Sequence, residues 1–145
     1  MKIGFTGTQD GMTQEQKDNL RLFLISISAR ELHHGDCIGA DAEAHAIAME
    51  MNIPVVIHPP SDPKKRAFCE GAAFVHPSKP YKIRNHHIVD ETEMQTATPN
   101  GKTEHLRSGT WMTVRYARKK HRIIWIFFPD GSISSNAPFL EENKS

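Results

Sequence analysis

The first part of the chain pairs a short apolar run with a segment of helical periodicity. Residues 2–6 are apolar and β-prone, which predicts a strand that ends at Gly7. Thr13 and Gln16 have the spacing of a capping box, which indicates the start of a helix. We expect this helix to end near residues 28–29. Four apolar side chains recur along it with the spacing of one buried face: Leu20, Phe23, Leu24 and Ile27.

The next segment repeats the order of strand, turn and helix. Residues 31–34 are weakly strand-like, and a glycine-punctuated turn at 35–41 leads into a helix expected over 42–51. Asp41 is the natural N-cap of that helix. Residues 53–58 are a continuous apolar run of the kind found in strands that are covered on both faces, and a proline pair ends it.

The second half of the chain is less regular. Residues 61–79 are polar and contain several prolines, with a possible helical piece at 65–73, and we interpret them as an excursion that could carry specificity. The elements expected after it are a short helix at 81–90, a weakly patterned strand at 93–98, a polar loop at 100–107, a helix at 108–119, a strong strand at 121–128 and a turn at 129–131.

This order of elements predicts the α/β fold class. Strands that alternate with helices, and strands that are apolar throughout, are typical of an open, mostly parallel sheet flanked by helices. We expect a single Rossmann-like domain over residues 1–131, with its polar excursion at 61–80, followed by an irregular C-terminal tail at 132–145. In such sheets, ligands bind at the loops that follow the C-terminal ends of the strands.

Composition narrows the class of protein further. The chain has 145 residues with 18 Lys and Arg against 17 Asp and Glu, and this balance argues against a broad nucleic-acid-binding face. No stretch approaches the ~20 apolar residues that span a bilayer, and the start has no signal-peptide pattern, so we expect a cytoplasmic protein without membrane contact. The two cysteines lack paired spacing, which favours neither a disulfide framework nor a zinc knuckle.

Three predicted strand-to-helix loops, at 7–9, 35–41 and 108–110, are rich in small residues. Glycine, serine and threonine at a helix N-terminus leave backbone N–H groups accessible, and the helix dipole favours an anion such as phosphate. The alternatives are a tight turn in the first loop and simple helix capping in the other two.

The same loops carry a family resemblance. The runs FTGT at 5–8, HGDCIGAD at 34–41 and SGTWMTVRYA at 108–117 together resemble the SLOG superfamily, which includes the Smf/DprA-type and lysine-decarboxylase-like proteins. The resemblance covers about residues 1–130 and is weakest at 61–79. It implies a Rossmann-like sheet that binds nucleotides or nucleotide-derived ligands. Members of the superfamily include sensors, DNA-binding proteins and phosphoribohydrolases.

One departure from the superfamily bears on catalysis. The phosphoribohydrolase branch has the pattern PGGxGTxxE, in which the glutamate assists cleavage at the anomeric carbon of the ribose. Thr113 stands at the position of that glutamate, and a hydroxyl cannot replace a carboxylate as a base or as a stabiliser of positive charge. Nucleoside 5′-monophosphate N-glycosidase activity is therefore the alternative function, in which Asp36, Asp41 or Glu104 would supply the carboxylate.

We predict a protein that binds a nucleotide or a nucleotide-derived signalling molecule without turnover, as a sensor or a sequestering protein. The resemblance implies antiviral signalling, or its inhibition, as one context. It also implies a homo-oligomer, to which Trp111 and Val114 would contribute. The candidate ligand-binding residues are Gly7, Thr8, Gln9, His34, Gly35, Asp36, Gly39, Ala40, Asp41, Arg84, Asn85, Ser108, Gly109, Thr110 and Arg115.

Metal binding has to be considered because the chain contains nine histidines. It has no HExxH motif and no close His/Cys spacing. His33 and His34 are adjacent on a predicted strand, so their side chains point to opposite faces and cannot jointly bind one ion. We therefore expect no metal site and no cofactor.

Overall fold

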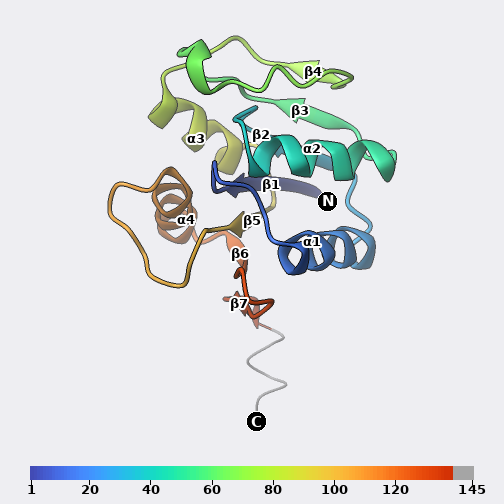
Figure 1. Cartoon of the computed structure of the whole chain (residues 1–145), viewed down its shortest axis with the longest axis vertical. Coiled ribbons are helices and arrows are strands. Elements are labelled where there is room, and N and C mark those ends of the chain that lie inside the picture. Colours follow the sequence, from blue (N-terminus) through green and yellow to red (C-terminus); the bar gives the residue numbers. More distant parts are fainter. Residues whose placement is uncertain (139–145) are drawn as a thin grey trace.

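In the computed structural model, which describes residues 1–138, seven strands form one sheet in the order β4-β3-β2-β1-β5-β6-β7 (Figure 1). Neighbouring strands are parallel except β6 and β7, which are antiparallel. The predicted α/β class with an open, mostly parallel sheet is therefore confirmed. The strands are β1 (Lys2–Gly7), β2 (Glu31–His34), β3 (Val55–Ile57), β4 (Phe74–Val75), β5 (Met94–Thr98), β6 (Ile123–Phe127) and β7 (Ile133–Ser135).

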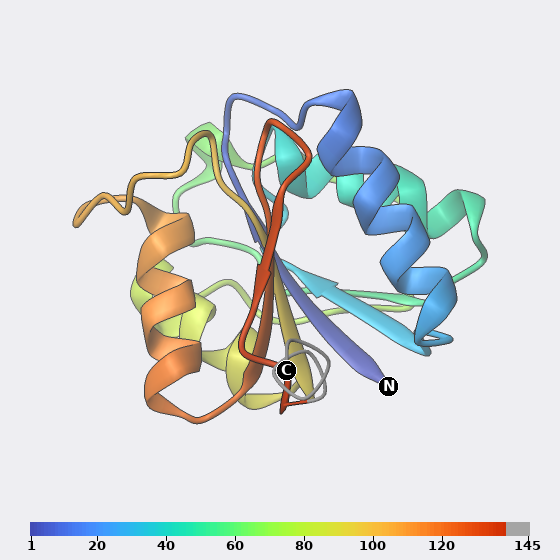
Figure 2. The same cartoon turned by 90° about the horizontal axis from the view of Figure 1, so that it is seen from below.

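The helices cover the sheet in two layers. Helices α1 (Gln14–Ser26) and α2 (Ala40–Glu50) lie on one face, and α3 (Tyr81–Asp90) and α4 (Gly109–Lys119) lie on the other (Figure 2). A short 3₁₀ turn, Pro63–Lys65, precedes β4. No helix in the described part of the chain is long and apolar enough to cross a membrane.

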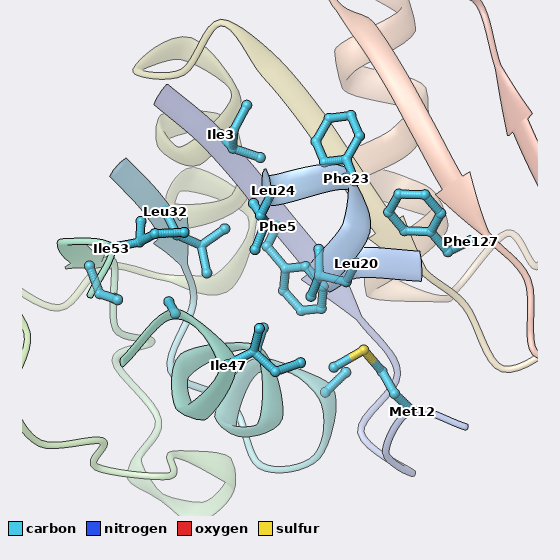
Figure 3. Packing of buried hydrophobic residues seen from close by; sticks show 14 of the residues in the cluster. Ile3, Phe5, Met12, Leu20, Phe23, Leu24, Leu32, Ile47, Ile53 and Phe127 are labelled. Atoms are coloured by element: carbon cyan, nitrogen blue, oxygen red, sulfur yellow. The ribbon is translucent and has the colours of Figure 1, made fainter. Parts of the chain in front are cut away.

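The larger apolar core fills the space between the sheet and the α1/α2 layer. Leu20 and Leu24 of α1 and Ile47 of α2 pack toward Phe5 of β1, and Phe5 is fully buried (Figure 3). Burial of each such side chain stabilises the fold by roughly 1.5–3 kcal/mol. The apolar spacing in the sequence therefore correctly identified the buried face of α1.

A second, smaller core lies between α4 and the other face of the sheet. Trp111 and Val114 pack there with Ala97 of β5 and Ile124 of β6. The exposed fractions of Trp111 and Val114 are 2% and 0%. The expectation that these two side chains form part of an oligomer surface is therefore wrong, because they are used within the subunit.

The polar excursion differs from its prediction. The helical piece expected at 65–73 does not form, because the backbone there bonds to the turn after β2 instead of to itself. The N–H of Ala67 donates to the carbonyl of Asp36 at 2.7 Å, and the N–H of Ile38 donates to the carbonyl of Lys65 at 3.0 Å. The excursion is thus a strap that is bound to the C-terminal edge of the sheet.

Part of the expected irregular tail is a strand. Residues 133–135 form β7, which pairs with the end of β6 through a turn closed by a hydrogen bond from the N–H of Phe128 to the carbonyl of Ser132 at 2.9 Å. The side-chain oxygen of Asn136 also accepts from the N–H of Ile124 at 2.8 Å. The sequence did not predict this strand because its ISS triplet has no apolar alternation. Residues 139–145 of the expected tail lie outside the described residues.

Gln16 ties α1 to the ends of two strands. Its side-chain nitrogen donates to the carbonyls of Pro99 at 2.7 Å and of Phe127 at 2.8 Å, and its side-chain oxygen accepts from the N–H of Thr13 at 3.0 Å. Gln16 is 1% exposed. The predicted capping box between Thr13 and Gln16 is present, and its glutamine also satisfies two buried carbonyl groups.

We expect Gln16→Leu to lower the free energy of unfolding by about 2–6 kcal/mol, because each of the two carbonyls loses its donor at a cost of about 1–3 kcal/mol. Urea denaturation measures this change. Gln14→Leu is the matched control, since the side chain of Gln14 bonds only to exposed Asp18 on the same helix. It should alter stability by less than about 0.5 kcal/mol. Equal effects of the two changes would contradict the assigned role of Gln16.

Candidate functional site

A cavity of about 810 Å³ opens at the C-terminal edge of the sheet. Its walls come from residues 7–10 at the end of β1, Cys37, residues 100, 105 and 107–110 around the β5–α4 loop, and residues 60–62, 65 and 80–81 along the strap and the start of α3. The chain leaves β1 toward α1 on one face of the sheet and leaves β5 toward α4 on the other face. Neighbouring strands whose connections part in this way form the topological switch point at which open α/β sheets bind ligands.

The N-terminus of α4 faces this cavity. Ser108 is the N-cap, and its hydroxyl accepts from the N–H of Trp111 at 3.3 Å. The N–H groups of Gly109 and Thr110, in the first turn, have no carbonyl partner inside the helix, and both residues line the cavity. A Cβ at Gly109 would overlap the hydroxyl of Tyr81. This end of the cavity therefore offers backbone donors and a partial positive charge.

The N-terminus of α2 is closed, in contrast. The N–H of Ala40 donates to the carbonyl of Thr8 at 3.0 Å. Gly39 has φ of +85°, and a Cβ there would overlap the carbonyl of Gln9. Gly39 and Ala40 are thus packed against the β1 loop, and neither lines the cavity. The prediction that this helix end cradles an anion is not supported by the geometry.

Asp41 does not cap α2, which corrects the sequence prediction. The helix begins at Ala40 with Gly39 as N-cap, so Asp41 lies in the first turn. Its carboxylate folds back to accept from the N–H groups of Gly35 at 3.2 Å and Cys37 at 3.1 Å. Burial raises the pKa of Asp41 to about 6, against the opposing effects of the Arg84 guanidinium and the two N–H donors.

Arg84 forms part of the floor beside the cavity. It extends from α3, is 2% exposed, and donates through Nη1 to the carbonyls of Gly35 at 2.6 Å and His58 at 3.4 Å. Arg84 and Asn85 line a recess of about 20 Å³, which has room for about one water molecule. Among the described residues, the Nε of Arg84 has no hydrogen-bond partner.

Two residues of the HGDCIGAD run are structural. His34 is fully buried, with Nδ1 accepting from the N–H of Asp36 at 2.9 Å and Nε2 sharing a hydrogen bond with His45 at 2.9 Å. The carboxylate of Asp36 accepts from Arg66 at 2.8 Å and from the N–H of Cys69 at 2.9 Å. Neither side chain lines the cavity, because both are turned toward α2 and the strap. His34 and Asp36 therefore lie outside the cavity, and their contact with a ligand stays a prediction.

Arg115 also lies apart from the cavity. Its guanidinium donates to the carbonyl of Leu106 at 2.8 Å and pairs with Glu104 at 3.7 Å. It lines a separate depression of about 230 Å³ together with Lys82 and Asn85. Arg115 therefore lies at the surface, because a position more than one turn beyond Thr110 has rotated away from the cavity.

The structure divides the remaining candidate residues between the cavity and the recess. Gly7 and Gln9 line both of them, and their contacts with a ligand stay a prediction. The other residues line one of the two. Those that line the cavity are Thr8, Ser108, Gly109 and Thr110, and those that line the recess are Gly35, Asp41, Arg84 and Asn85.

Sequence reasoning missed several cavity residues from the strap and the β5–α4 loop. Tyr81 begins α3 and overhangs Gly109, and Lys65, Asn100 and Arg107 stand at the cavity walls. Lys65 belongs to the only basic run of the strap, which was a usable signal for an anion site. No signal in the sequence indicated that Tyr81 lies at the site, since Pro80 and Tyr81 have the pattern of an ordinary helix start.

Thr113 does not face the cavity. It is 1% exposed, and its hydroxyl donates to the carbonyl of Gly109 at 2.9 Å, one turn back along α4. Of the carboxylates that could replace the missing glutamate, Glu104 is paired with Arg118 and Arg115. Asp41 reaches only the water-sized recess.

Two solved structures have a similar fold. A molybdenum cofactor binding protein from the phototrophic bacterium Rippkaea orientalis matches with a TM-score of 0.69 and 16% identity, over 99% of this chain and 80% of that chain. DNA processing protein A from Streptococcus pneumoniae matches with a TM-score of 0.60 and 15% identity, over 86% of this chain. This chain spans about half (49%) of that protein. Identities this low support the fold alone.

No protein family model and no curated protein matches the chain in sequence.

We expect the ionisation of Asp41 to weaken the fold as pH rises. Its pKa is about 6 in the folded state against an ordinary value of 3.8, so the folded state binds more protons between these values and stability falls across that interval. Asp41→Asn removes this contribution while keeping an oxygen acceptor for both N–H groups. The variant should gain up to about 3 kcal/mol relative to wild type between pH 4 and pH 7, by urea denaturation. If the free energies of unfolding of the wild type and Asp41→Asn changed with pH in parallel, the raised pKa would be contradicted.

Proposed function

We propose that the cavity binds a nucleotide or a nucleotide-derived molecule and holds its phosphate at the N-terminus of α4. The observation that carries this proposal is the cavity itself, whose end wall presents the first-turn N–H groups of Gly109 and Thr110. Donors of this kind, combined with the positive end of the helix dipole, favour phosphate oxygens. A volume of about 810 Å³ lies within the range of about 300–1,000 Å³ that is typical of small-molecule sites.

The other residues that line the cavity suit the rest of such a ligand. Tyr81 offers an aromatic surface, and Pro60 and Pro80 add apolar surface around it. Asn100 and Ser61 supply the hydrogen-bonding groups that orient a heterocycle. Lys65 and Arg107 lie near enough to the cavity to balance the charge of more than one phosphate. The strap thus takes the role of specificity wall in this proposal.

Binding without turnover is favoured over glycosidic cleavage. Thr113 replaces the glutamate of the hydrolase pattern and is buried in α4. Asp36 is fully buried and paired with Arg66, so it cannot act at a ribose in the cavity. A sensing or sequestering role in the cytoplasm, and assembly into a homo-oligomer, belong to the same proposal.

The molybdenum cofactor is a second candidate ligand. It is favoured by the fold match that covers 99% of this chain, since that neighbour is a molybdenum cofactor binding protein. The α4 end of the cavity would serve equally for a phosphate on a pterin.

Ligand identity and turnover can be tested in one experiment. The purified chain is incubated with a library of nucleoside phosphates and, separately, with the molybdenum cofactor, and both retained and released molecules are analysed by mass spectrometry. We expect an intact phosphate-bearing ligand to be retained. Retention of the molybdenum cofactor alone would favour the second candidate, and failure to retain any of these ligands would overturn the proposal.

Gly109→Val should weaken ligand binding at least tenfold, measured by calorimetric titration with the ligand retained in that experiment. The new side chain would displace the hydroxyl of Tyr81 and cover the two accessible N–H groups. Gly101→Val is the matched control on the same loop, because a Cβ at Gly101 meets no atom within 4 Å. Unchanged affinity in Gly109→Val would place the phosphate elsewhere.

Gly39→Val is unsuited to this test, although Gly39 belongs to the predicted phosphate loops. Its φ of +85° and the neighbouring Gln9 carbonyl mean that a side chain there strains the turn directly.

Prolonged incubation with AMP or CMP should release no free base above the protein-free background, because Thr113 stands at the position of the hydrolase glutamate and neither Asp36 nor Glu104 lines the cavity. Chromatography of the reaction mixture measures this. Base release that disappears in Asp41→Asn would move the chemistry to the recess and favour the N-glycosidase alternative.

A further inference from the structure

We propose that His33, His58 and Glu91 form a binding site for a divalent transition-metal ion of the Zn²⁺ class, separate from the cavity. His33 lies on β2, His58 follows β3, and Glu91 follows α3. The ring nitrogens of His33 (Nδ1) and His58 (Nε2) are 2.9 Å apart, and one carboxylate oxygen of Glu91 lies 3.9 Å and 3.5 Å from them. Three ligand atoms from three elements thus converge on one point.

The separations suit a zinc ion after a small adjustment. Zinc binds imidazole nitrogen at about 2.0–2.1 Å in tetrahedral geometry, which places two ligand nitrogens about 3.3 Å apart. The two rings therefore need to part by only a few tenths of an ångström. Imidazole nitrogen with carboxylate oxygen is a donor set that zinc uses widely.

The surroundings of His33 prepare it as a ligand. Its other ring nitrogen, Nε2, lies 2.6 Å from the carboxylate of Glu31, to which it donates its proton. This leaves Nδ1 unprotonated and directed at the site. A carboxylate behind a histidine is the usual way in which proteins orient a metal-binding imidazole and increase its basicity.

The site is deep on one side and open on the other. His33 and His58 are 3% and 2% exposed, whereas the side chain of Glu91 is 41% exposed and gives an ion access from solvent. His76, after β4, stacks on His58 with ring centroids 4.3 Å apart, and its Nε2 lies 3.2 Å from the same carboxylate oxygen. His76 thus lies beside the exposed carboxylate at the open side of the site. A bound ion would link β2 and β3 to the end of α3.

A second cluster in the described part of the chain, His34, His45 and Cys69, has a similar spacing but the wrong hydrogen bonds. The N–H of Asp36 donates to Nδ1 of His34, so the proton of that neutral ring is on Nε2, the atom that faces the cluster. A ring that bound metal through Nε2 would carry its proton on Nδ1 and clash with that N–H. The two clusters thus differ in where a ring proton can move. A backbone N–H occupies Nδ1 of His34, whereas Nδ1 of His58 has no hydrogen bond in the described part of the chain and can take the proton that Nε2 shares with His33.

This proposal revises the expectation of no metal site. That expectation considered His33 together with His34, which do point to opposite faces of β2. His33 instead meets His58 and Glu91, which lie far along the chain, so no short motif reveals the set.

The test uses the full chain, free of any affinity tag and treated with a chelator, and titrates it with Zn²⁺ in a calorimeter. We expect about one ion per chain. Glu91→Gln should weaken binding at least tenfold, and Glu31→Gln should weaken it about 10–100-fold by releasing the orientation of His33. Zn²⁺ should also raise the thermal unfolding temperature of wild type, and not that of Glu91→Gln at the same concentration.

Two controls bear on the position of the ion. Glu93→Gln changes a nearby exposed carboxylate that bonds to the N–H of Lys2, and it should leave Zn²⁺ affinity unchanged. Cys69→Ser should also leave it unchanged, and Co²⁺ bound to wild type should show no thiolate charge-transfer band. A loss of affinity in Cys69→Ser, a thiolate band, unchanged binding in Glu91→Gln, or no saturable binding by wild type would each overturn the proposal. The measurement is independent of the ligand in the cavity.

Discussion

The buried guanidinium of Arg84 is the interaction on which the C-terminal edge of the sheet depends. A buried cation is costly unless polar partners surround it. Arg84 extends from α3 on one face and reaches the carbonyl of Gly35, at the end of β2. The turn that supplies this carbonyl leads directly into α2 on the other face, where Asp41 lies in the first helical turn. One side chain therefore joins the two helical layers across the end of the sheet and fixes the floor beside the cavity.

The elements that could be predicted from the sequence are those with one buried apolar face. Leu20 and Leu24 define α1 by spacing alone, and they pack as that spacing indicates. The strap could not be predicted, because its backbone partners are the carbonyl and carboxylate of Asp36, thirty positions earlier in the chain. Central strand β5 was the weakest prediction for another reason. The hydroxyl of its buried Thr96 donates to the carbonyl of Gly4. Because this hydrogen bond allows a polar side chain to be buried, the strand needs few apolar residues.

Part of the candidate site could also be predicted from the sequence. Small residues at strand-to-helix turns are a local signal, and Thr8 and Gly109 indeed lie at the cavity. The run around His34 carries the same signal, yet Cys37 alone of that run lines the cavity, since a sequence does not specify which side of a turn each residue occupies. Tyr81 reaches the cavity only because the strap brings the start of α3 beside α4, which is a tertiary effect.

The position of β5 in the sheet has a consequence for how the chain folds. Ile3 of β1 pairs with Met94 of β5, although β2, β3 and β4 all lie between them in the sequence. Contacts between such distant segments form slowly, because the entropy of closing a long loop must be lost before the contact stabilises anything. During synthesis, the innermost strand therefore waits for a partner that is made late. Until then, the edge of β1 that pairs with β5 in the finished sheet is open to wrong pairing.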